Sequence, residues 1–238
     1  YSIALGGGFC GKALANGQYS LAMGGRTTAS GDTSTAIGGG AEATGENSLA
    51  MGTHMIGSVN KAVASGGASI SIGHNSIAAG DASMALGIQS KALNRYSFAA
   101  NGGIVDTNAS GIPGGIAMGI GAKVTGAGAF ALSTNSTSSW GQSGTEFSWN
   151  TGSTTLASGN GAIAMGNNIT ASGSGSVAIG QYATASGSGS TVVGQGTASG
   201  LNSLVVGYGT ASGKASLALG GTSAGKYSLA AAGATTET

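Results

Sequence analysis

The sequence predicts an all-β fold, a parallel β-roll in which about fifteen short coils of chain stack on one another. Three observations predict it: a five-residue motif recurs fifteen times, its copies mostly start 14 residues apart, and each copy alternates bulky and small side chains. Glycine supplies 49 of the 238 residues, far above the usual ~7%. Because 40% of the residues are hydrophobic, this glycine content does not indicate disorder. Internal repeats therefore organise the chain.

The repeated motif is Ser-x-Ala-x-Gly or a close relative of it. It reads Ser2-Ile-Ala-Leu-Gly6 in the first copy and Ser48-Leu-Ala-Met-Gly52 in a later one. The copies start at positions 2, 20, 34, 48, 69, 83, 97, 115, 129, 162, 176, 190, 203, 216 and 228. Bulky apolar residues occupy the second and fourth positions, with small residues between them. Alternation with a period of two predicts a strand rather than a helix.

A second alternating segment follows each motif. It reads Ala-Glu-Ala-Thr-Gly at 41–45 and Ala-Thr-Ala-Ser-Gly at 183–187. Glycine-rich turns separate the two segments, since glycine takes positive φ without strain. Each period is therefore expected to form one coil of strand, turn, strand and turn. Stacked coils would pair each strand in parallel with its equivalent one coil away.

The charged residues indicate which faces point outward. Nine of the 15 charges fall into two columns, one at a turn and one on the second strand: Asp32, Glu46, Asp81, Arg95, Lys214 and Lys226; and Glu42, Lys91 and Lys123. Since charges belong in water, these columns predict an interior of Ala41, Ala43, Ala122 and Val124, packed against the bulky residues of the motif. The small residues of the first strand would then form an uncharged outer face. Such a face predicts self-association with cyclic symmetry.

Four longer intervals mark insertions into a single repetitive domain spanning 1–238, near 6–19, 53–68, 102–114 and 134–161. The longest contains Trp140, Phe147 and Trp149. These aromatic residues either pack against the side of the roll for stability or form a recognition loop, because tryptophan is enriched at binding hot spots. Both interpretations stay open at this point.

Composition argues against several classes of function. Eight basic and seven acidic side chains leave a net charge of +1, too little to neutralise a nucleic-acid backbone. The single cysteine, Cys10, has no partner for an internal disulfide, and neither His54 nor His74 shares a coil with another metal-ligating residue. We therefore expect no catalytic site, metal or cofactor, and no enzymatic activity. The sequence shows no apolar run of the roughly 20 residues that cross a bilayer, so any export signal or anchor is expected outside this segment.

The two alternating motifs at a 14-residue period resemble the head of trimeric autotransporter adhesins of the Yersinia adhesin type. The copies most similar to that head's Asn-Ser-Val-Ala-Ile-Gly motif are Asn47-Ser-Leu-Ala-Met-Gly52 and Asn202-Ser-Leu-Val-Val-Gly207. Most other copies carry a different residue before the serine, such as Tyr19, Thr33 or Ala82. The resemblance implies a left-handed parallel β-roll, three chains around a threefold axis, and display on the outer membrane of a Gram-negative bacterium.

The resemblance also implies partners and site residues. Such heads bind host extracellular matrix proteins of the collagen or fibronectin type, or other cells and surfaces, and are anchored through parts outside this segment. The candidate ligand-binding residues are Trp140, Phe147, Trp149, Asn47, Ser48, Asn202 and Ser203. The candidate residues of the trimer interface are Ser34, Ala36, Ser48, Ala50, Ser176 and Ala178. Two alternatives remain: a spacer in the shaft of a surface fibre, and a trimeric phage tail fibre.

Overall fold

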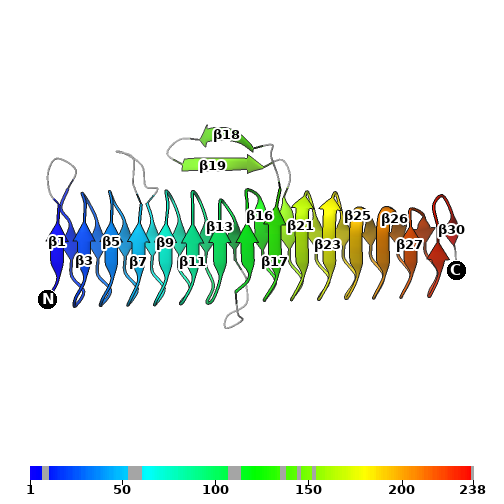
Figure 1. Ribbon diagram of the computed structural model, residues 1–238, viewed down its shortest axis with the longest axis horizontal. Helices are drawn as coiled ribbons and strands as arrows, with labels where there is room; N and C mark the ends of the chain where they lie inside the picture. The colour runs from blue at the N-terminus through cyan, green and yellow to red at the C-terminus, as the bar shows by residue number, and fades with distance from the viewer. Residues whose placement is uncertain are drawn as a thin grey trace. The chain divides into compact units, whose positions relative to one another are not determined.

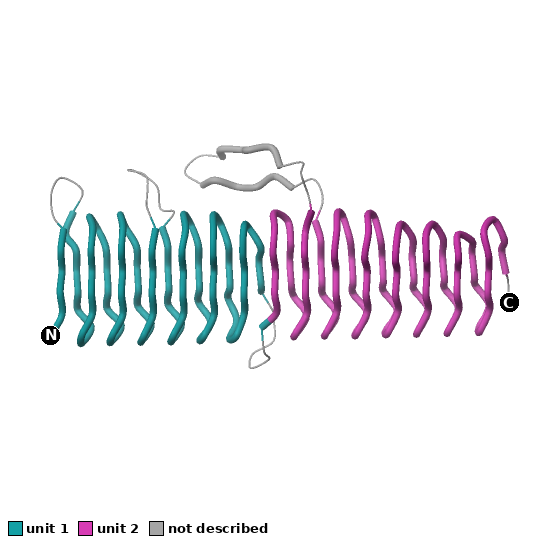
Figure 2. The backbone as a smooth tube through the Cα atoms, viewed as in Figure 1, with its two compact units in different colours: residues 1–114, 139–150 teal, residues 115–138, 151–238 magenta. Residues whose placement is uncertain are grey.

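The computed structural model describes residues 1–6, 11–52, 61–106, 114–134 and 154–236, together with the backbone of two strands between 138 and 151. Its contacts divide the chain into two units: unit 1 comprises 1–114 and 139–150, and unit 2 comprises 115–138 and 151–238 (Figure 2). Within the described ranges the regular structure consists of β-strands, and no helix could span a membrane. Cys10, His54 and Pro113 lie outside the described residues.

In unit 1, each copy of the motif forms a first strand and each following segment forms a second strand (Figure 1). The first strands are β1 (Ile3–Leu5), β3 (Leu21–Met23), β5 (Thr35–Ile37), β7 (Leu49–Met51), β9 (Ile70–Ile72), β11 (Met84–Leu86) and β13 (Phe98–Ala100). The second strands are β2 (Leu14–Ala15), β4 (Thr28–Ala29), β6 (Glu42–Ala43), β8 (Val63–Ala64), β10 (Ile77–Ala78), β12 (Lys91–Ala92) and β14 (Ile104–Val105).

Unit 2 repeats this arrangement. Its first strands are β15 (Ile116–Met118), β17 (Phe130–Ser133), β21 (Ile163–Asn167), β23 (Val177–Gln181), β25 (Thr191–Ala198), β26 (Leu204–Ala211), β27 (Leu217–Leu219) and β29 (Leu229–Ala230). Its second strands are β16 (Ala122–Val124), β20 (Thr155–Ala157), β22 (Thr170–Ala171), β24 (Thr184–Ala185), β28 (Thr222–Ser223) and β30 (Thr235–Thr236). The continuous strands β25 and β26 pass through both sheets. A separate two-stranded sheet consists of β18 (Ser138–Ser143) and β19 (Glu146–Thr151).

Successive coils pair in parallel and in equivalent register, as the period predicts. In unit 1, Ala36 of β5 lies opposite Ala50 of β7, and Ala29 of β4 lies opposite Ala43 of β6. In unit 2, Ala164 of β21 lies opposite Ala178 of β23. The all-β parallel solenoid expected from the sequence is therefore confirmed.

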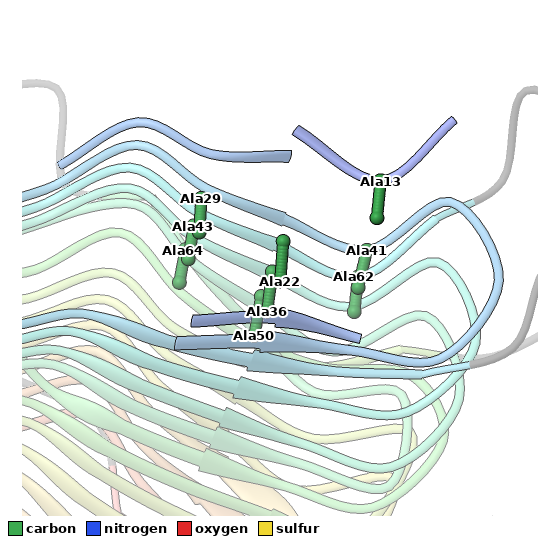
Figure 3. Close-up of a cluster of buried hydrophobic side chains, with 9 residues drawn as sticks. All are labelled: Ala13, Ala22, Ala29, Ala36, Ala41, Ala43, Ala50, Ala62 and Ala64. Carbon is green, nitrogen blue, oxygen red and sulfur yellow. The ribbon is translucent and has the colours of Figure 1, made fainter. Parts of the chain in front are cut away.

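Alanine forms the interior of the coils. Figure 3 shows three columns of alanines in unit 1, which point into the space between the two sheets: Ala22, Ala36 and Ala50 from first strands; Ala29, Ala43 and Ala64 from second strands; and Ala13, Ala41 and Ala62 from the residues before them. Eight of these nine side chains are at most 1% exposed. Ala122 and Val124 are buried in unit 2 in the same way. The expected interior positions of the second segment are thus confirmed.

The predicted orientation of the first strand is wrong. Ala50 is fully buried, whereas its neighbours Leu49 and Met51 lie on the opposite, outward face of β7. A coil of 14 residues encloses too little space for leucine or methionine on one sheet against alanine on the other, so the small residues turn inward. The proposed interface residues Ser34, Ala36, Ser48, Ala50, Ser176 and Ala178 are all at most 2% exposed. They belong to the interior of the coil and cannot form an interface between chains.

The glycine that ends most of the second segments is required by close stacking of the coils. A Cβ atom built on Gly31 would lie 2.0 Å from the carbonyl oxygen of Gly45, and one on Gly173 would lie 2.0 Å from that of Gly187. Because the obstructing atoms are backbone, no side-chain movement relieves the overlap. The recurrence of glycine at this position therefore follows from the contact between successive coils.

Candidate functional site

The first strands expose an apolar face, which we call the outward apolar face. It consists of the second and fourth residues of each motif, whose side chains lie in register from coil to coil: Leu21, Thr35, Leu49, Ile70 and Met84 in one column of unit 1, with Met23, Ile37, Met51, Ile72 and Leu86 beside them. Unit 2 continues the pattern, and Ile179, for example, is 37% exposed. A contiguous apolar surface of this kind marks an interaction site in a folded protein.

The turn that precedes each first strand, the entry turn, explains the asparagine of the motif. Asn47 and Asn202 are exposed and have φ values of 55° and 53°. Tyr19 and Tyr96 occupy the equivalent position with φ values of 56° and 55°. Since asparagine tolerates this left-handed conformation better than most residues, its presence reflects the backbone of the turn. Both asparagines are predicted ligand-binding residues, and their exposed side chains are available for contact.

The neighbouring serines face the other way. Ser48 is 2% exposed and its hydroxyl donates to the carbonyl of Gly45 at 2.6 Å. Ser203 makes the same bond to Gly200 at 2.8 Å. Both hydroxyls stabilise the entry turn from inside the coil, so neither serine is available to a ligand, contrary to the prediction.

Side chains on the entry turns also link successive coils. The Oδ1 atom of Asp32 accepts a hydrogen bond from the backbone N–H of Gln18 at 2.9 Å, and Asp81 accepts one from Gly67 at the same distance. Arg95 lies 3.7 Å from the carboxylate of Asp81 in an exposed ion pair. As predicted, the charged column of the entry turn is exposed to solvent.

The outward face of the second strands differs between the two units. In unit 1 it carries mixed residues, among them Glu42, Val63, Ile77 and Lys91, and Glu42 forms an ion pair with Lys61. In unit 2 threonine recurs in successive coils: Thr170, Thr184, Thr197, Thr210, Thr222 and Thr235. From Thr170 onward this face is hydrophilic in unit 2, where Lys123 and Leu156 precede the threonines, whereas in unit 1 it is mixed.

The turn from a first strand to a second strand, the cross turn, carries exposed residues that the sequence pattern does not single out. In unit 2, Tyr182 and Tyr208 are 58% and 69% exposed. Gln181 and Gln195 lie beside them, and Nε2 of Gln195 donates to Oε1 of Gln181 at 3.3 Å. In the sequence, these tyrosines are visible only as residues that follow the motif, in Gly-Gln-Tyr and Gly-Tyr-Gly. The period alone does not show whether such a tyrosine binds a ligand or simply occupies a turn.

The remaining candidates do not converge on a chemical site in the part of the chain that the structure describes. No group of three or more His, Cys, Asp or Glu residues there could hold a metal ion. The side chains of Trp140, Phe147 and Trp149 lie outside the described residues. The described surface is therefore one of repeated columns.

Comparison with known proteins identifies the family to which these repeats belong. A family model described as the YadA head domain repeat matches the chain over 15–41, 29–54, 64–90, 78–100, 113–132, 151–168 and 171–197. Together these ranges cover more than half of its length. The chain belongs to the YadA head family. No curated protein matches it. A parallel β-solenoid built from YadA head repeats fits the head of a trimeric autotransporter adhesin, and such heads belong to surface-exposed adhesins of Gram-negative bacteria.

Proposed function

We propose that three copies of this chain associate through the outward apolar face and that the trimer attaches a bacterium to host extracellular matrix, cells or other surfaces. The observation that carries the proposal is the column of bulky apolar residues on the outward face, which recurs in both units. Leaving such a face in water is unfavourable at about 25 cal/mol per Å² of apolar surface. A threefold axis along the stacking direction would bury the same face of every coil in all three chains.

The attachment itself would be binding rather than catalysis. The repeated faces offer the same contact in coil after coil, and three chains multiply weak contacts by avidity. Extended partners of the collagen or fibronectin type suit such a surface. Membership of the YadA head family supports display on the outer membrane, through an anchor outside this segment.

Light scattering on paired variants tests the association. We expect the unmodified chain to be a trimer at micromolar concentration. Ile179→Glu places three like charges in the buried interface, at a cost of several kcal/mol, and should yield monomers or nonspecific aggregates. Thr184→Glu is the matched control, since Thr184 lies on the outward face of the neighbouring second strand, and should remain trimeric. A monodisperse monomer for the unmodified chain contradicts the proposal.

Binding to immobilised collagen, fibronectin and an uncoated hydrophobic surface tests attachment. We expect the trimer to bind at least one of them, and a dissociated Ile179→Glu variant to bind more weakly because avidity is lost. A stable trimer that binds neither matrix proteins, nor host cells, nor surfaces would instead be a spacer.

A further inference from the structure

We propose that the cross turns of unit 2 form a binding site for a linear, uncharged glycan, with Tyr182 and Tyr208 as its two aromatic platforms. The inference rests on the proposed function as an adhesin and names a ligand class for it. It concerns the edge of the coil where first strands turn into second strands, next to the outward apolar face, since Tyr208 lies two residues beyond Val206.

The two tyrosines are spaced along the stack at a fixed interval. Gly180 of one coil lies opposite Gly194 of the next, which lies opposite Gly207 of the third. Tyr208 is the first residue after Gly207, in register with Gln195, and Tyr182 is the second residue after Gly180. The two tyrosines therefore lie two coils apart, at neighbouring positions of the cross turn. With strands about 4.8 Å apart, that separation is roughly 10 Å along the stack. An extended ligand lying parallel to the stack could therefore contact both rings.

Glycine leaves the ring of Tyr208 open. Gly207 and Gly209 flank it in sequence, and Gly194 and Gly196 lie opposite them in the preceding coil. A Cβ atom built on Gly207 would meet nothing within 4 Å. Since no side chain grows from these positions, the apolar face of the ring is available to a flat apolar surface such as the C–H face of a sugar.

The side chains between the rings supply both donors and acceptors. Gln195 lies directly opposite Tyr208 in register, and its amide donates to that of Gln181. This bond uses one N–H of Gln195 and one lone pair of Gln181, so both amides keep donors and acceptors for a ligand, as do the two phenol groups. Sugar hydroxyls also donate and accept. A polyproline-type peptide presents mainly carbonyl acceptors and would leave the acceptors of this site unused.

The absence of charge selects an uncharged ligand. Outside the segment 135–153, no residue described between Lys123 and Lys214 is charged. Lys214 itself belongs to the entry turns, at the opposite edge of the coil. Sulfated or carboxylated polymers would find no cation here to pair with, whereas a neutral glycan carries no charge that needs a partner.

The exposed tyrosines Tyr96 and Tyr227 of the entry turns, unlike those of the cross turns, lie next to cations. The guanidinium of Arg95 lies 5.3 Å from the ring centre of Tyr96, and the ammonium of Lys226 lies 5.2 Å from that of Tyr227. In the described structure, neither Tyr182 nor Tyr208 makes a contact with a cation or another ring. Tyr227 is as exposed as Tyr208, at 68%, and therefore provides the matched control.

The chain itself supplies substitutions that remove the rings and keep the backbone. Tyr182→Asn restores the residue at the equivalent cross turn one coil earlier, Asn168, which has nearly the same φ (53° against 55°). Tyr208→Gln restores the residue opposite it, Gln195. Tyr227→Asn, the control, restores Asn202 of an earlier entry turn, with φ of 53° against 57°. Thermal unfolding of the full chain checks that each variant folds as the unmodified protein does.

The experiment is an array of neutral linear oligosaccharides, with sulfated oligosaccharides and a triple-helical Gly-Pro-Pro peptide as competing probes. We expect the unmodified trimer to bind neutral oligosaccharides. Each single variant should weaken that binding about fivefold to tenfold, in line with the energy of one aromatic contact. The double variant should lose it, and Tyr227→Asn should leave it unchanged.

Three results would overturn the inference: no binding to any neutral oligosaccharide, binding that survives in the double variant, or a tyrosine-dependent preference for the sulfated or peptide probes. The proposed function is tested separately by the matrix proteins and surfaces above. A trimer that adheres to those but ignores every neutral glycan rejects the glycan site alone, whereas a chain that neither trimerises nor adheres rejects the adhesin proposal.

Discussion

The interiors of the two units consist mainly of small side chains, although unit 2 also buries Ile169, Val192 and Val205, and their outer faces differ more. Inward positions carry alanine in both, as at Ala50 and Ala178. On the outward face of the second strands, unit 1 varies from Glu42 to Ile77, whereas unit 2 keeps threonine in six successive coils. Outside β18 and β19, the described residues of unit 1 include five basic and five acidic side chains, and those of unit 2 include three lysines and no carboxylate. Coil stacking thus restricts the inward side chains, whereas the outward side chains can vary and contact different partners.

The largest expected effect is that of adding one methyl group where coils touch. Gly31→Ala in unit 1 and Gly173→Ala in unit 2 each place a Cβ atom 2.0 Å from a backbone oxygen. Both should lower the free energy of unfolding by about 3 kcal/mol or more, because overpacking against backbone is not relieved by side-chain movement. Urea unfolding at fixed protein concentration measures the loss.

Gly175→Asn is the control for this comparison. Gly175 lies two residues beyond Gly173, has φ of 63°, and a Cβ atom there would meet nothing within 4 Å. Asparagine already occupies the equivalent position at Asn202, so stability should change by less than about 1 kcal/mol. A loss in unit 1 very different from that in unit 2 would show that their interiors are not equivalent.

A smaller effect is expected from the hydroxyls inside the entry turns. Ser48→Ala in unit 1 and Ser203→Ala in unit 2 each remove a buried hydrogen bond to a turn carbonyl, which should cost about 1 kcal/mol. Ser34 and Ser176 are buried at the same position without a partner for their hydroxyl, so their alanine variants should be less affected. Thermal melts of the four variants test the difference, and equal losses at all four positions would contradict it.

The smallest effect is expected on the outward face of the second strands. Thr184→Ile gives unit 2 the residue that unit 1 carries at Ile77. Since the position is only half-buried and β-branched residues suit strands, stability should change by no more than about 0.5 kcal/mol. A thermal melt measures the change. A loss comparable to that of Gly173→Ala would mean that the threonine column is structural.

Much of the fold could be predicted from the sequence because the pattern is repetitive. Period, strand positions and parallel pairing follow from the spacing, and the exposed entry-turn charges follow from the cost of burying them. The inward face of the first strand does not follow, because alternation distinguishes two faces without saying which one is inside. A usable signal was the spread of volumes: outward positions hold residues as different as Thr35 and Phe98, whereas Ala50 and its equivalents are alanine or serine except at Val192 and Val205. The narrow interior limits the size of the inward side chains, whereas the outward face has no such limit.

The candidate site was less predictable. Asn47 and Asn202 were found because they belong to the motif, although their backbone conformation accounts for them. Tyr182 and Tyr208 were missed because they occupy different positions of their cross turns, and only the spacing of those turns brings them within two coils of each other. That spacing depends on coil lengths that fall from 14 to 13 residues between these turns.

The equivalent register of successive coils has a genetic consequence. Each coil pairs with the coil before it and with the coil after it through equivalent residues. If one whole period is removed, the two coils brought together can therefore pair in the same register as any other neighbours. An in-frame loss or duplication of fourteen codons should therefore yield a folded chain. Recombination between repeats could in this way change the length of the molecule, and the number of antibody epitopes on it, without a single amino-acid substitution.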